Sequence, residues 1–129
     1  MNVILVDAFD KAVPTFKTTY PTLPQPFLTC TNRTFNEQEE LYTHGRTAPG
    51  IIVTNARGGQ SPHNHLPSLA FDIAFIGLNK QLDWHEDLFK KFADIIIAIE
   101  PRIEWGGSWK FKDSPHFQLR NYETYIIKK

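Results

Sequence analysis

The sequence predicts an α+β domain, with a small, mainly antiparallel sheet flanked by helices. Segments with helical signals and segments with strand signals both occur, but they do not follow the strand–helix–strand rhythm of parallel-sheet proteins. A length of 129 residues predicts a single domain over residues 1–129 with one core. Hydrophobic residues make up 41% of the chain and charged residues 22%, so the apolar side chains that such a core needs are present.

The first half of the chain predicts three elements after a proline-rich start. Residues 14–27 contain four prolines and predict an extended connector on the surface. FLTC then predicts a short strand. Thr34, with Glu37 three residues later, forms a capping box that predicts a short helix, which Gly45 would end. The NEQEE stretch of this helix is expected to face solvent, and GIIVT at residues 50–54 predicts a buried strand.

The second half predicts one long strand, one long helix and two short strands. SLAFDIAF alternates in the period of a half-buried strand, with one face formed by Leu69, Phe71, Ile73 and Phe75. Asp83 and Glu86 predict a second capping box ahead of a helix that ends before Pro101. The core stripe of this helix is expected to contain Leu88, Phe92, Ile95 or Ile96, and Ile99. RIEW and HFQL read as two further strands, separated by a glycine turn near Gly106.

An aspartate inside the apolar strand is the most unusual feature of the sequence. The second face of SLAFDIAF carries Ala70, Asp72 and Ala74, so two small side chains flank one carboxylate. An unpaired carboxylate on a buried strand is costly, so it requires a cation or several hydrogen-bond donors. HFQL has the same arrangement, because His116 and Gln118 lie on the face opposite to its apolar residues.

These residues predict a metal site. His63 lies in a turn shortly before Asp72, and with His116 it completes a set of two imidazoles and one carboxylate. Three protein ligands leave a fourth position open, as a catalytic zinc site requires. Nitrogen and oxygen ligands suit Zn²⁺, although other divalent metals remain open. Asp113, three residues before His116 across a Ser-Pro turn, is placed to act as a general base.

Each of these residues also has a structural interpretation. A single histidine near a strand is commonly a satisfied structural residue, and a strand aspartate is commonly capped by backbone donors. Cys30 is interpreted as a small packed hydrophobe rather than a nucleophile. Trp109 either lines a substrate cleft or packs beneath the loop before Asp113, whereas Trp105 is expected to pack there.

Composition excludes several classes of function. Lysine and arginine total 14, as do aspartate and glutamate, so the chain lacks the basic surplus of a nucleic-acid binder. One cysteine excludes an internal disulfide. The start, MNVILVDAFDK, has neither a basic region nor the apolar run of a signal peptide, and no segment reaches about 18 apolar residues. These features predict synthesis in the cytoplasm without a signal peptide and no membrane insertion.

Three stretches resemble a known family. CTNRTFNEQEELYTHGRTAPGIIVTNARGGQS, SPHN with LAFD, and WGGSWKFKDSPHFQL are similar to the zinc peptidases of the D-alanyl-D-alanine carboxypeptidase family. They look most like its L-alanyl-D-glutamate endopeptidase branch, found in phage endolysins and bacterial wall hydrolases. The resemblance runs from about residue 27 to residue 119 and implies the small α+β fold that these peptidases share with the hedgehog signalling domain.

The resemblance assigns roles to individual residues. It implies that His63, Asp72 and His116 bind Zn²⁺ and that Asp113 is the acidic catalytic residue. Arg57 resembles an arginine that binds substrate and assists catalysis. Ser61 is implied to contact substrate or to support the first ligand.

The spacing of the first two ligands departs from the family pattern. Many members have seven positions from histidine to aspartate, whereas His63 to Asp72 is nine and His65 to Asp72 is seven. Both histidines are therefore candidates for the first ligand. SPHN matches the start of the family motif, so His63 is preferred, with a two-residue loop insertion before Asp72.

The resemblance implies a monomeric, zinc-dependent hydrolase of the peptidoglycan stem peptide that cleaves the L-alanyl-D-glutamate bond. A D-Ala-D-Ala carboxypeptidase or dipeptidase is the nearest alternative, and a non-catalytic zinc-containing binding module is the alternative from another class. A compact phage endolysin, bacteriolytic and released from the host cytoplasm to the cell wall or periplasm, fits these expectations, and a bacterial housekeeping hydrolase remains open.

Overall fold

The computed structural model describes residues 1–44, 46–47, 54, 56, 61–65 and 67–126. Three helices and a five-stranded antiparallel sheet form the described part of the chain, which confirms the predicted α+β class. The helices and strands are α1 (Val3–Thr19), β1 (Gln25–Cys30), α2 (Phe35–Thr43), β2 (Ala70–Ile76), β3 (Leu82–Asp83), α3 (Glu86–Ile99), β4 (Ile103–Trp105) and β5 (His116–Leu119).

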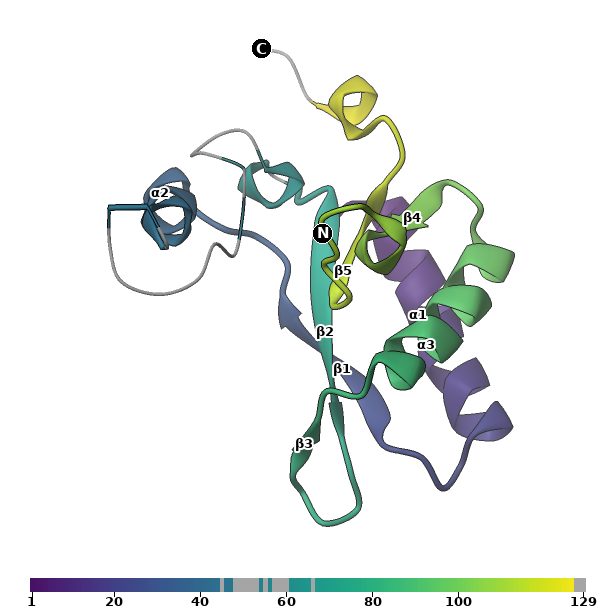
Figure 1. Cartoon of the computed structure of the whole chain (residues 1–129). Coiled ribbons are helices and arrows are strands. Elements are labelled where there is room, and N and C mark those ends of the chain that lie inside the picture. The colour runs from purple at the N-terminus through teal and green to yellow at the C-terminus, as the bar shows by residue number, and fades with distance from the viewer. Residues whose placement is uncertain (45, 48–53, 55, 57–60, 66, 127–129) are drawn as a thin grey trace.

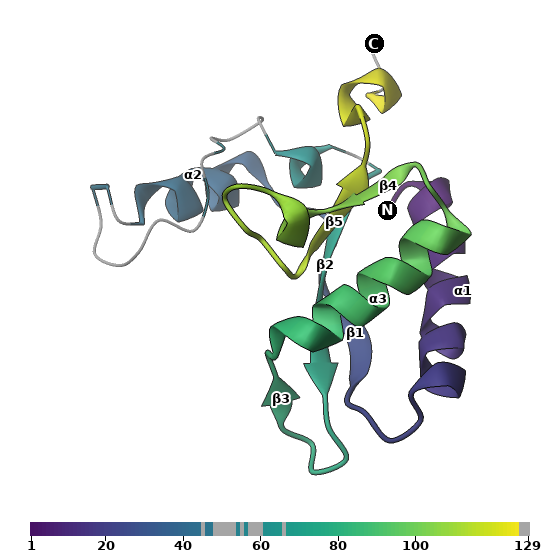
Figure 2. The ribbon, with the colours of Figure 1, turned by 45° about the vertical axis from the view of Figure 1, so that its right-hand side comes forward.

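The sheet has the strand order β1-β2-β5-β4, and β3 pairs with the far end of β2 as a short hairpin. Helices α1 and α3 lie together on one side of the sheet, and α2 lies on the other side of β2 (Figures 1 and 2). Short 3₁₀ turns at Pro62–Asn64 and Gly106–Ser108 lie in the connections that approach β2 and β5. The sheet therefore has one face covered by two helices and one face free to carry a site.

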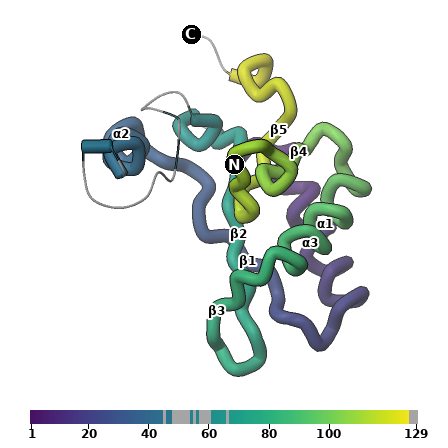
Figure 3. The backbone as a smooth tube through the Cα atoms, in the orientation of Figure 1, coloured from purple at the N-terminus to yellow at the C-terminus, as the bar shows by residue number. Residues whose placement is uncertain are grey.

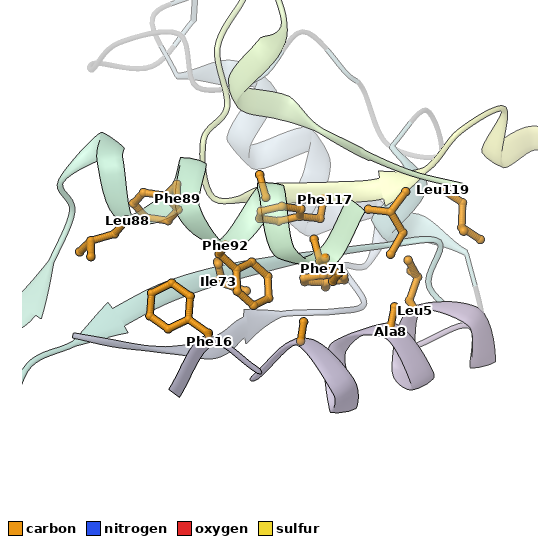
Figure 4. Close-up of a cluster of buried hydrophobic side chains, with 14 of the residues drawn as sticks. Leu5, Ala8, Phe16, Phe71, Ile73, Leu88, Phe89, Phe92, Phe117 and Leu119 are labelled. Atoms are coloured by element: carbon orange, nitrogen blue, oxygen red, sulfur yellow. The ribbon is translucent and has the colours of Figure 1, made fainter. Parts of the chain in front are cut away.

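The core fills the space between the sheet and helices α1 and α3 (Figure 4). Leu69, Phe71, Ile73 and Phe75 of the predicted apolar face are all buried, as are Phe117 and Leu119 of β5. Helix α3 contributes Leu88, Phe92 and Ile96, as its spacing predicts, together with Phe89 and Ala93, while Ile95 and Ile99 are partly buried. The capping box of Thr34 and Glu37 is also confirmed at the start of α2.

The predicted extended connector at residues 14–27 is wrong over its first part, because α1 extends to Thr19 and only residues 20–24 connect this helix to β1. Helix α1 runs through Pro14, and its buried face is formed by Leu5, Ala8, Ala12 and Phe16. These residues recur every three or four positions, so they cover the core from one helix face. Pro14 lies on the exposed side, where its missing N–H costs one helical hydrogen bond. Burial of the apolar face outweighs that cost.

The second predicted capping box is also wrong. Asp83 pairs with Phe75 in the β2–β3 hairpin, and its carboxylate accepts a hydrogen bond from the backbone N–H of His85. Helix α3 therefore begins two residues later than predicted, with His85 as its N-cap. Gly45 and residues 50–53 lie outside the described residues, so the predicted C-cap glycine and the strand at 50–54 stay predictions.

Replacing Pro14 with alanine is expected to stabilise the protein. Alanine restores the backbone N–H and removes the ring clash, which together stabilise a helix interior by about 3 kcal/mol. The unfolded chain becomes more flexible without the proline ring, and this lowers the gain in the free energy of unfolding by up to about 1 kcal/mol. Thermal unfolding followed by circular dichroism should show a Tm raised by several degrees. Lys17→Ala, on the exposed side of the same helix, serves as the control with little change. A lower Tm for Pro14→Ala would show that the ring makes a stabilising contact.

Candidate active site

The register of the sheet brings Asp72 and His116 together. The two residues are direct partners across the antiparallel pair β2–β5, and Cys30 is the partner of Asp72 across β1–β2. Side chains at directly opposite positions share one face of a sheet. This face is the one opposite the core, and the neighbouring Ala70 and Ala74 have small side chains that leave room above the strand.

His63 reaches the same place from a 3₁₀ turn rather than from a strand. Ser61 caps this turn, because its hydroxyl accepts a hydrogen bond from the His63 backbone N–H at 3.2 Å. The carbonyl of His63 accepts hydrogen bonds from the backbone N–H of Arg33 at 2.8 Å and from the amide of Asn32 at 3.1 Å. Ser61 is buried, so its observed contact is the support of His63, one of the two roles expected for it.

Three side-chain atoms meet at the distances of a metal site. His63 Nε2 lies 3.3 Å from Asp72 Oδ1, His116 Nδ1 lies 3.2 Å from the same oxygen, and the two nitrogens are 3.2 Å apart. Bonds of about 2.0–2.2 Å in a tetrahedral zinc site put the ligand atoms about 3.3–3.6 Å apart. The His-Asp-His triangle, formed by His63, Asp72 and His116, therefore fits one small divalent cation.

Hydrogen bonds behind the triangle set which nitrogen of each histidine faces it. His63 Nδ1 lies 2.9 Å from the carbonyl oxygen of Thr31, which can only accept, so Nδ1 donates, and in the neutral imidazole that a metal requires Nε2 carries the lone pair. Gln118 donates from Nε2 to Glu104 at 2.6 Å, so its Oε1, 2.8 Å from His116 Nε2, is the acceptor there. His116 Nδ1 consequently presents a lone pair to the triangle. Such partners orient metal-binding histidines.

In the absence of a metal the triangle is an ion pair. Burial is the largest single effect on the imidazole of His63 and opposes its charge, but hydrogen bonds to Asp72 and Cys30 outweigh it and raise the pKa of His63 from 6.5 to about 9. Burial opposes the charge of Asp72 as well, yet hydrogen bonds from His116 and His63 hold the pKa of this carboxyl well below its usual range. The metal-free site therefore holds a carboxylate beside an imidazolium at neutral pH.

Asp113 lies at the rim of the triangle. Its Oδ2 is 3.9 Å from His116 Nδ1, and its side chain is 43% exposed. Burial raises the pKa of the Asp113 carboxyl above its ordinary value. A carboxyl group beside the triangle with a raised pKa is suited to exchange protons with a substrate.

The loop before Asp113 is held by close backbone packing. The backbone N–H of Asp113 donates to the carbonyl of Gly106 at 2.9 Å, and a Cβ on Gly106 would collide with the carbonyl oxygen of Asp113. Trp105, which packs against the core as expected, donates from its indole to the carbonyl of Ser114 at 2.7 Å. The hydroxyl of Ser114 in turn donates to Glu86 at 2.7 Å. The close contact between the backbone at position 106 and the backbone of Asp113 therefore requires glycine at position 106.

Arg33 and Gln38 belong to the site and were missed by the sequence analysis. Arg33 Nη2 lies 3.4 Å from Asp72 Oδ2, and its Nη1 donates to the amide oxygen of Gln38 at 2.7 Å. Gln38 is fully buried and also donates to Thr54 and to the carbonyl of Ala56. The expectation that NEQEE faces solvent is therefore wrong at Gln38. The inward position of Gln38 follows from its distant partners Thr54 and Ala56, and the NEQEE pattern by itself carries no signal of it.

A pocket of about 280 Å³ opens over the triangle. Arg33, Asp113 and Trp109 contribute to its walls, and the Trp109 ring centroid lies 5.2 Å from that of His116. Of the two roles left open for Trp109, the structure places it at the pocket. His65 instead lies beside Tyr122, with ring centroids 6.3 Å apart. Arg57 lies outside the described residues, so its assignment stays a prediction.

Cys30 is a competing metal donor beside the triangle. Ligand atoms of Cys30, His63 and Asp72 lie within 4.8 Å of one another. The sulfur faces His63 Nδ1 at 3.9 Å, but that nitrogen already donates to a backbone carbonyl. The atoms of the His-Asp-His triangle are closer together and have free lone pairs, so the set with His116 is the better metal site. Cys30 is half-buried at the edge of the site rather than packed in the core.

The sequence of this region also matches a family of known proteins. A family model described as D-alanyl-D-alanine carboxypeptidase matches residues 54–119, half of the chain. This chain belongs to the D-alanyl-D-alanine carboxypeptidase family. The matched range includes all three residues of the triangle and Asp113, so the family resemblance expected from the sequence is confirmed.

Individual members of the carboxypeptidase family extend the comparison. The peptidoglycan L-alanyl-D-glutamate endopeptidase CwlK of Bacillus subtilis is 42% identical over 95 residues, which cover 67% of this chain and 56% of CwlK. The chain thus spans about half the length of this relative. The structure of the Serratia marcescens L-Ala D-Glu endopeptidase ChiX has 25% identity and a TM-score of 0.60, over 90% of this chain and 81% of ChiX.

Two more distant structures of this kind share the fold. The vancomycin resistance D,D-pentapeptidase VanY, an E175A mutant solved in complex with Zn(II), gives a TM-score of 0.65 at 10% identity, over 98% of this chain and 80% of VanY. The L,D-carboxypeptidase DacB from Streptococcus pneumonia gives 0.55 at 17% identity, over 96% and 70% of the two chains. None of the helices in the described ranges of this family member has the length and apolar character needed to cross a membrane.

The metal-free protein is expected to lose stability as pH rises from 6.5 to 9. The pKa of His63 is higher in the folded protein than in the unfolded chain, so its stabilising contribution is fully present below 6.5 and is lost through about 9. The slope in this window should reach about 1.4 kcal/mol per pH unit. Urea unfolding with a chelator present measures it. His63→Gln is the matched control, and equal pH profiles for both proteins would contradict this prediction.

Proposed function

We propose that this protein is a zinc-dependent peptidoglycan hydrolase that cleaves the L-alanyl-D-glutamate bond of the stem peptide. The observation that supports it most is the His-Asp-His triangle, with Asp113 at its rim, inside a pocket open to solvent. The named activity of CwlK, at 42% identity, supports the choice of bond.

His63, Asp72 and His116 would hold the zinc ion, because their three atoms fit one tetrahedral cation and leave one position open. When bound, zinc supplies Lewis-acid chemistry, making a carbonyl carbon more electrophilic and a water molecule more acidic. Thr31 and Gln118 keep the two imidazoles in the required tautomers, so the ligands need little rearrangement on binding.

Asp113 would act first as base and then as acid. Its carboxylate takes a proton from the attacking water as the carbon–oxygen bond forms, and returns a proton to the amide nitrogen as the carbon–nitrogen bond breaks. The effect of burial on its pKa brings this carboxyl closer to the working pH, which favours both transfers. The hydrogen bonds of the Gly106 loop keep it at the rim of the triangle.

Arg33 would bind the negative charge of the substrate. Its guanidinium lines the pocket beside the triangle, and Gln38 fixes one of its nitrogens from the opposite side. A glutamyl residue that is linked onward through one of its carboxyl groups keeps the other as a free carboxylate, and an arginine held in place is suited to bind it. The predicted contribution of Arg57 would add to this. Trp109 supplies an apolar wall against which the peptide can lie.

A second candidate reaction is the removal of terminal D-alanine, because the matching family model is described as D-alanyl-D-alanine carboxypeptidase. The pocket chemistry is the same for both reactions, and they differ in which bond of the stem peptide is cleaved. The phage origin, the release from a host cell and the monomeric state stay predictions.

The reaction is tested by digesting purified peptidoglycan with and without a chelator, followed by mass analysis of the fragments. New D-glutamate amino termini, lost with chelator and restored by zinc, are the expected result. Release of terminal D-alanine instead would assign the protein to the carboxypeptidase reaction. Tight zinc binding without cleavage of any bond would overturn both and favour a non-catalytic binding module.

Three variants separate metal binding from catalysis. His63→Ala should lose zinc and activity together, because two ligands remain. Asp113→Ala should keep zinc and lose activity by at least about 100-fold, the contribution of a general base. His65→Ala is the matched control and should keep both. Metal analysis and peptidoglycan digestion measure the two properties, and zinc loss in His65→Ala with retention in His63→Ala would reverse the assignment of the first ligand.

A further inference from the structure

A second and larger cavity lies at the other end of β2. This hairpin pocket, about 540 Å³ in volume, is formed where the α1–β1 connection, the β2–β3 hairpin and the residues before α3 meet. Figure 3 shows the hairpin and this connection reaching the same end of the molecule, away from α2. The residues used below are Leu78, Asn79, Gln81, Asp83 and Trp84, all of which line it. Its volume lies within the range of about 300–1,000 Å³ usual for ligand sites.

Trp84 forms a rigid aromatic wall of the hairpin pocket. Its ring lies nearly parallel to that of Phe89, with centroids 6.1 Å apart and planes 14° apart. Phe89 is buried and makes an edge contact with Phe75, so the stack is anchored in the core. The Trp84 side chain nevertheless remains 55% exposed. One face of the indole is therefore fixed by packing, and the other is available to a ligand at little entropic cost.

The hairpin that frames the pocket is also fixed. The backbone N–H of Gly77 donates to the carbonyl of Gln81, and that of Lys80 donates to Gly77, both at 2.9 Å. Lys80 adopts φ 61°, the left-handed conformation that closes such a loop. The Asn79 side chain accepts from the backbone of Gln81 at 3.1 Å. The pocket is thus built on an ordered turn.

Polar groups surround the aromatic wall at short range. Asn79 and Gln81 carry exposed side-chain amides, and Asn79 Nδ2 donates to Gln81 Oε1 at 3.4 Å, so each amide keeps part of its hydrogen-bonding capacity for a ligand. Asp83 carries a carboxylate that His85 holds by hydrogen bonds. Within the part of the chain that the structure describes, no lysine or arginine lines the cavity. The lining therefore suits a neutral polar ligand better than a phosphate or another anion.

The apolar surface near the pocket is larger than a short hairpin requires for folding. Leu78 is 90% exposed and Leu82 is 53% exposed, in addition to Trp84. A cluster of exposed apolar side chains more often belongs to a binding site than to a surface that is exposed without a function. A pyranose ring combines an apolar face of C–H groups with hydroxyl and acetamido groups at its edge. The aromatic wall matches the apolar face of such a ring, and the surrounding amides and carboxylate match the polar groups at its edge.

We infer that the hairpin pocket binds an N-acetylated sugar of the peptidoglycan glycan strand, with the ring stacked on Trp84 and its edge groups bound by Asn79, Gln81 and Asp83. The inference rests on the proposed function, since the glycan and the stem peptide belong to one polymer. Gly77, the first hairpin residue that lines the pocket, lies five residues along the chain from Asp72, or roughly 17 Å at the usual rise of a strand. A polymer can therefore occupy the hairpin pocket and the catalytic pocket together.

Binding is tested with tri-N-acetylchitotriose as the probe and metal-free protein. Amide chemical shifts should change around residues 77–85, and Trp84→Ala should weaken binding at least about tenfold, within the range reported for loss of an aromatic stacking partner. Gln81→Ala, an exposed change that should not affect folding, is expected to weaken it less. Phe35→Ala removes an equally exposed aromatic ring on α2 and is the matched control. Shifts elsewhere, no binding, or a dimer broken by Trp84→Ala would overturn the inference.

Hydrolysis assays separate this inference from the proposed function. Trp84→Ala should raise KM for intact peptidoglycan and leave cleavage of a glycan-free stem peptide unchanged. An equal loss on both substrates would mean that Trp84 acts through the fold and would contradict a glycan site. If the wild-type protein cleaves neither substrate, the proposed function fails, and chitotriose binding alone decides the presence of the sugar site.

Discussion

The pairing of Asp72 with His116 across strands β2 and β5 is the contact on which the rest of the site depends. The backbone register places the carboxylate and the imidazole opposite each other, so no loop has to be ordered to bring them together. A carboxylate that is largely removed from water requires compensation, and His63, His116 and Arg33 supply it from three directions. The groups that make this carboxylate tolerable in the metal-free fold include the two histidines proposed as ligands of a cation.

The remaining groups of the site are added to this pair by short, well-fixed connections. The 3₁₀ turn at Pro62–Asn64 delivers His63 and is tied to Arg33 through the backbone. The loop after β4 delivers Asp113 and is tied to α3 through Ser114 and Glu86. Strands thus provide two of the proposed ligands at a fixed spacing, and loops provide the third proposed ligand and Asp113, the proposed proton-transferring group. Local order in those loops is what prepares the site for its chemistry.

Features governed by local sequence could be predicted, and those governed by tertiary contacts could not. The alternation of β2 and the capping box of α2 are encoded within a few residues, so both were found. Helix α1 was missed because Pro14 is a strong local signal for a break, which burial of the helix face overrides. The capping box predicted at Asp83 was wrong because Asp83 pairs with Phe75 in the β2–β3 hairpin and is therefore not the N-cap of α3.

The same distinction applies to the site. The residue types and their motif identified the triangle and Asp113 as candidates, since a strand aspartate with small neighbours is unusual by itself. Arg33 and Gln38 were missed because their roles depend on residues distant in sequence, Asp72 for Arg33 and both Thr54 and Ala56 for Gln38. The position of Cys30 beside His63 follows from a register shift between Leu28 and Cys30 in β1, which no pattern of a single strand reveals.

The alternation of β2 also determines where the chain can change length during evolution. Gaining or losing one residue inside this strand would turn Asp72 toward the helices and an aromatic or aliphatic side chain toward the catalytic pocket, so both the core and the chemistry would fail at once. The described residues between His63 and β2 lie outside the strand pairings, so this constraint does not apply to them. The two-residue insertion predicted between His63 and Asp72 would therefore leave the register of β2 with β5 unchanged.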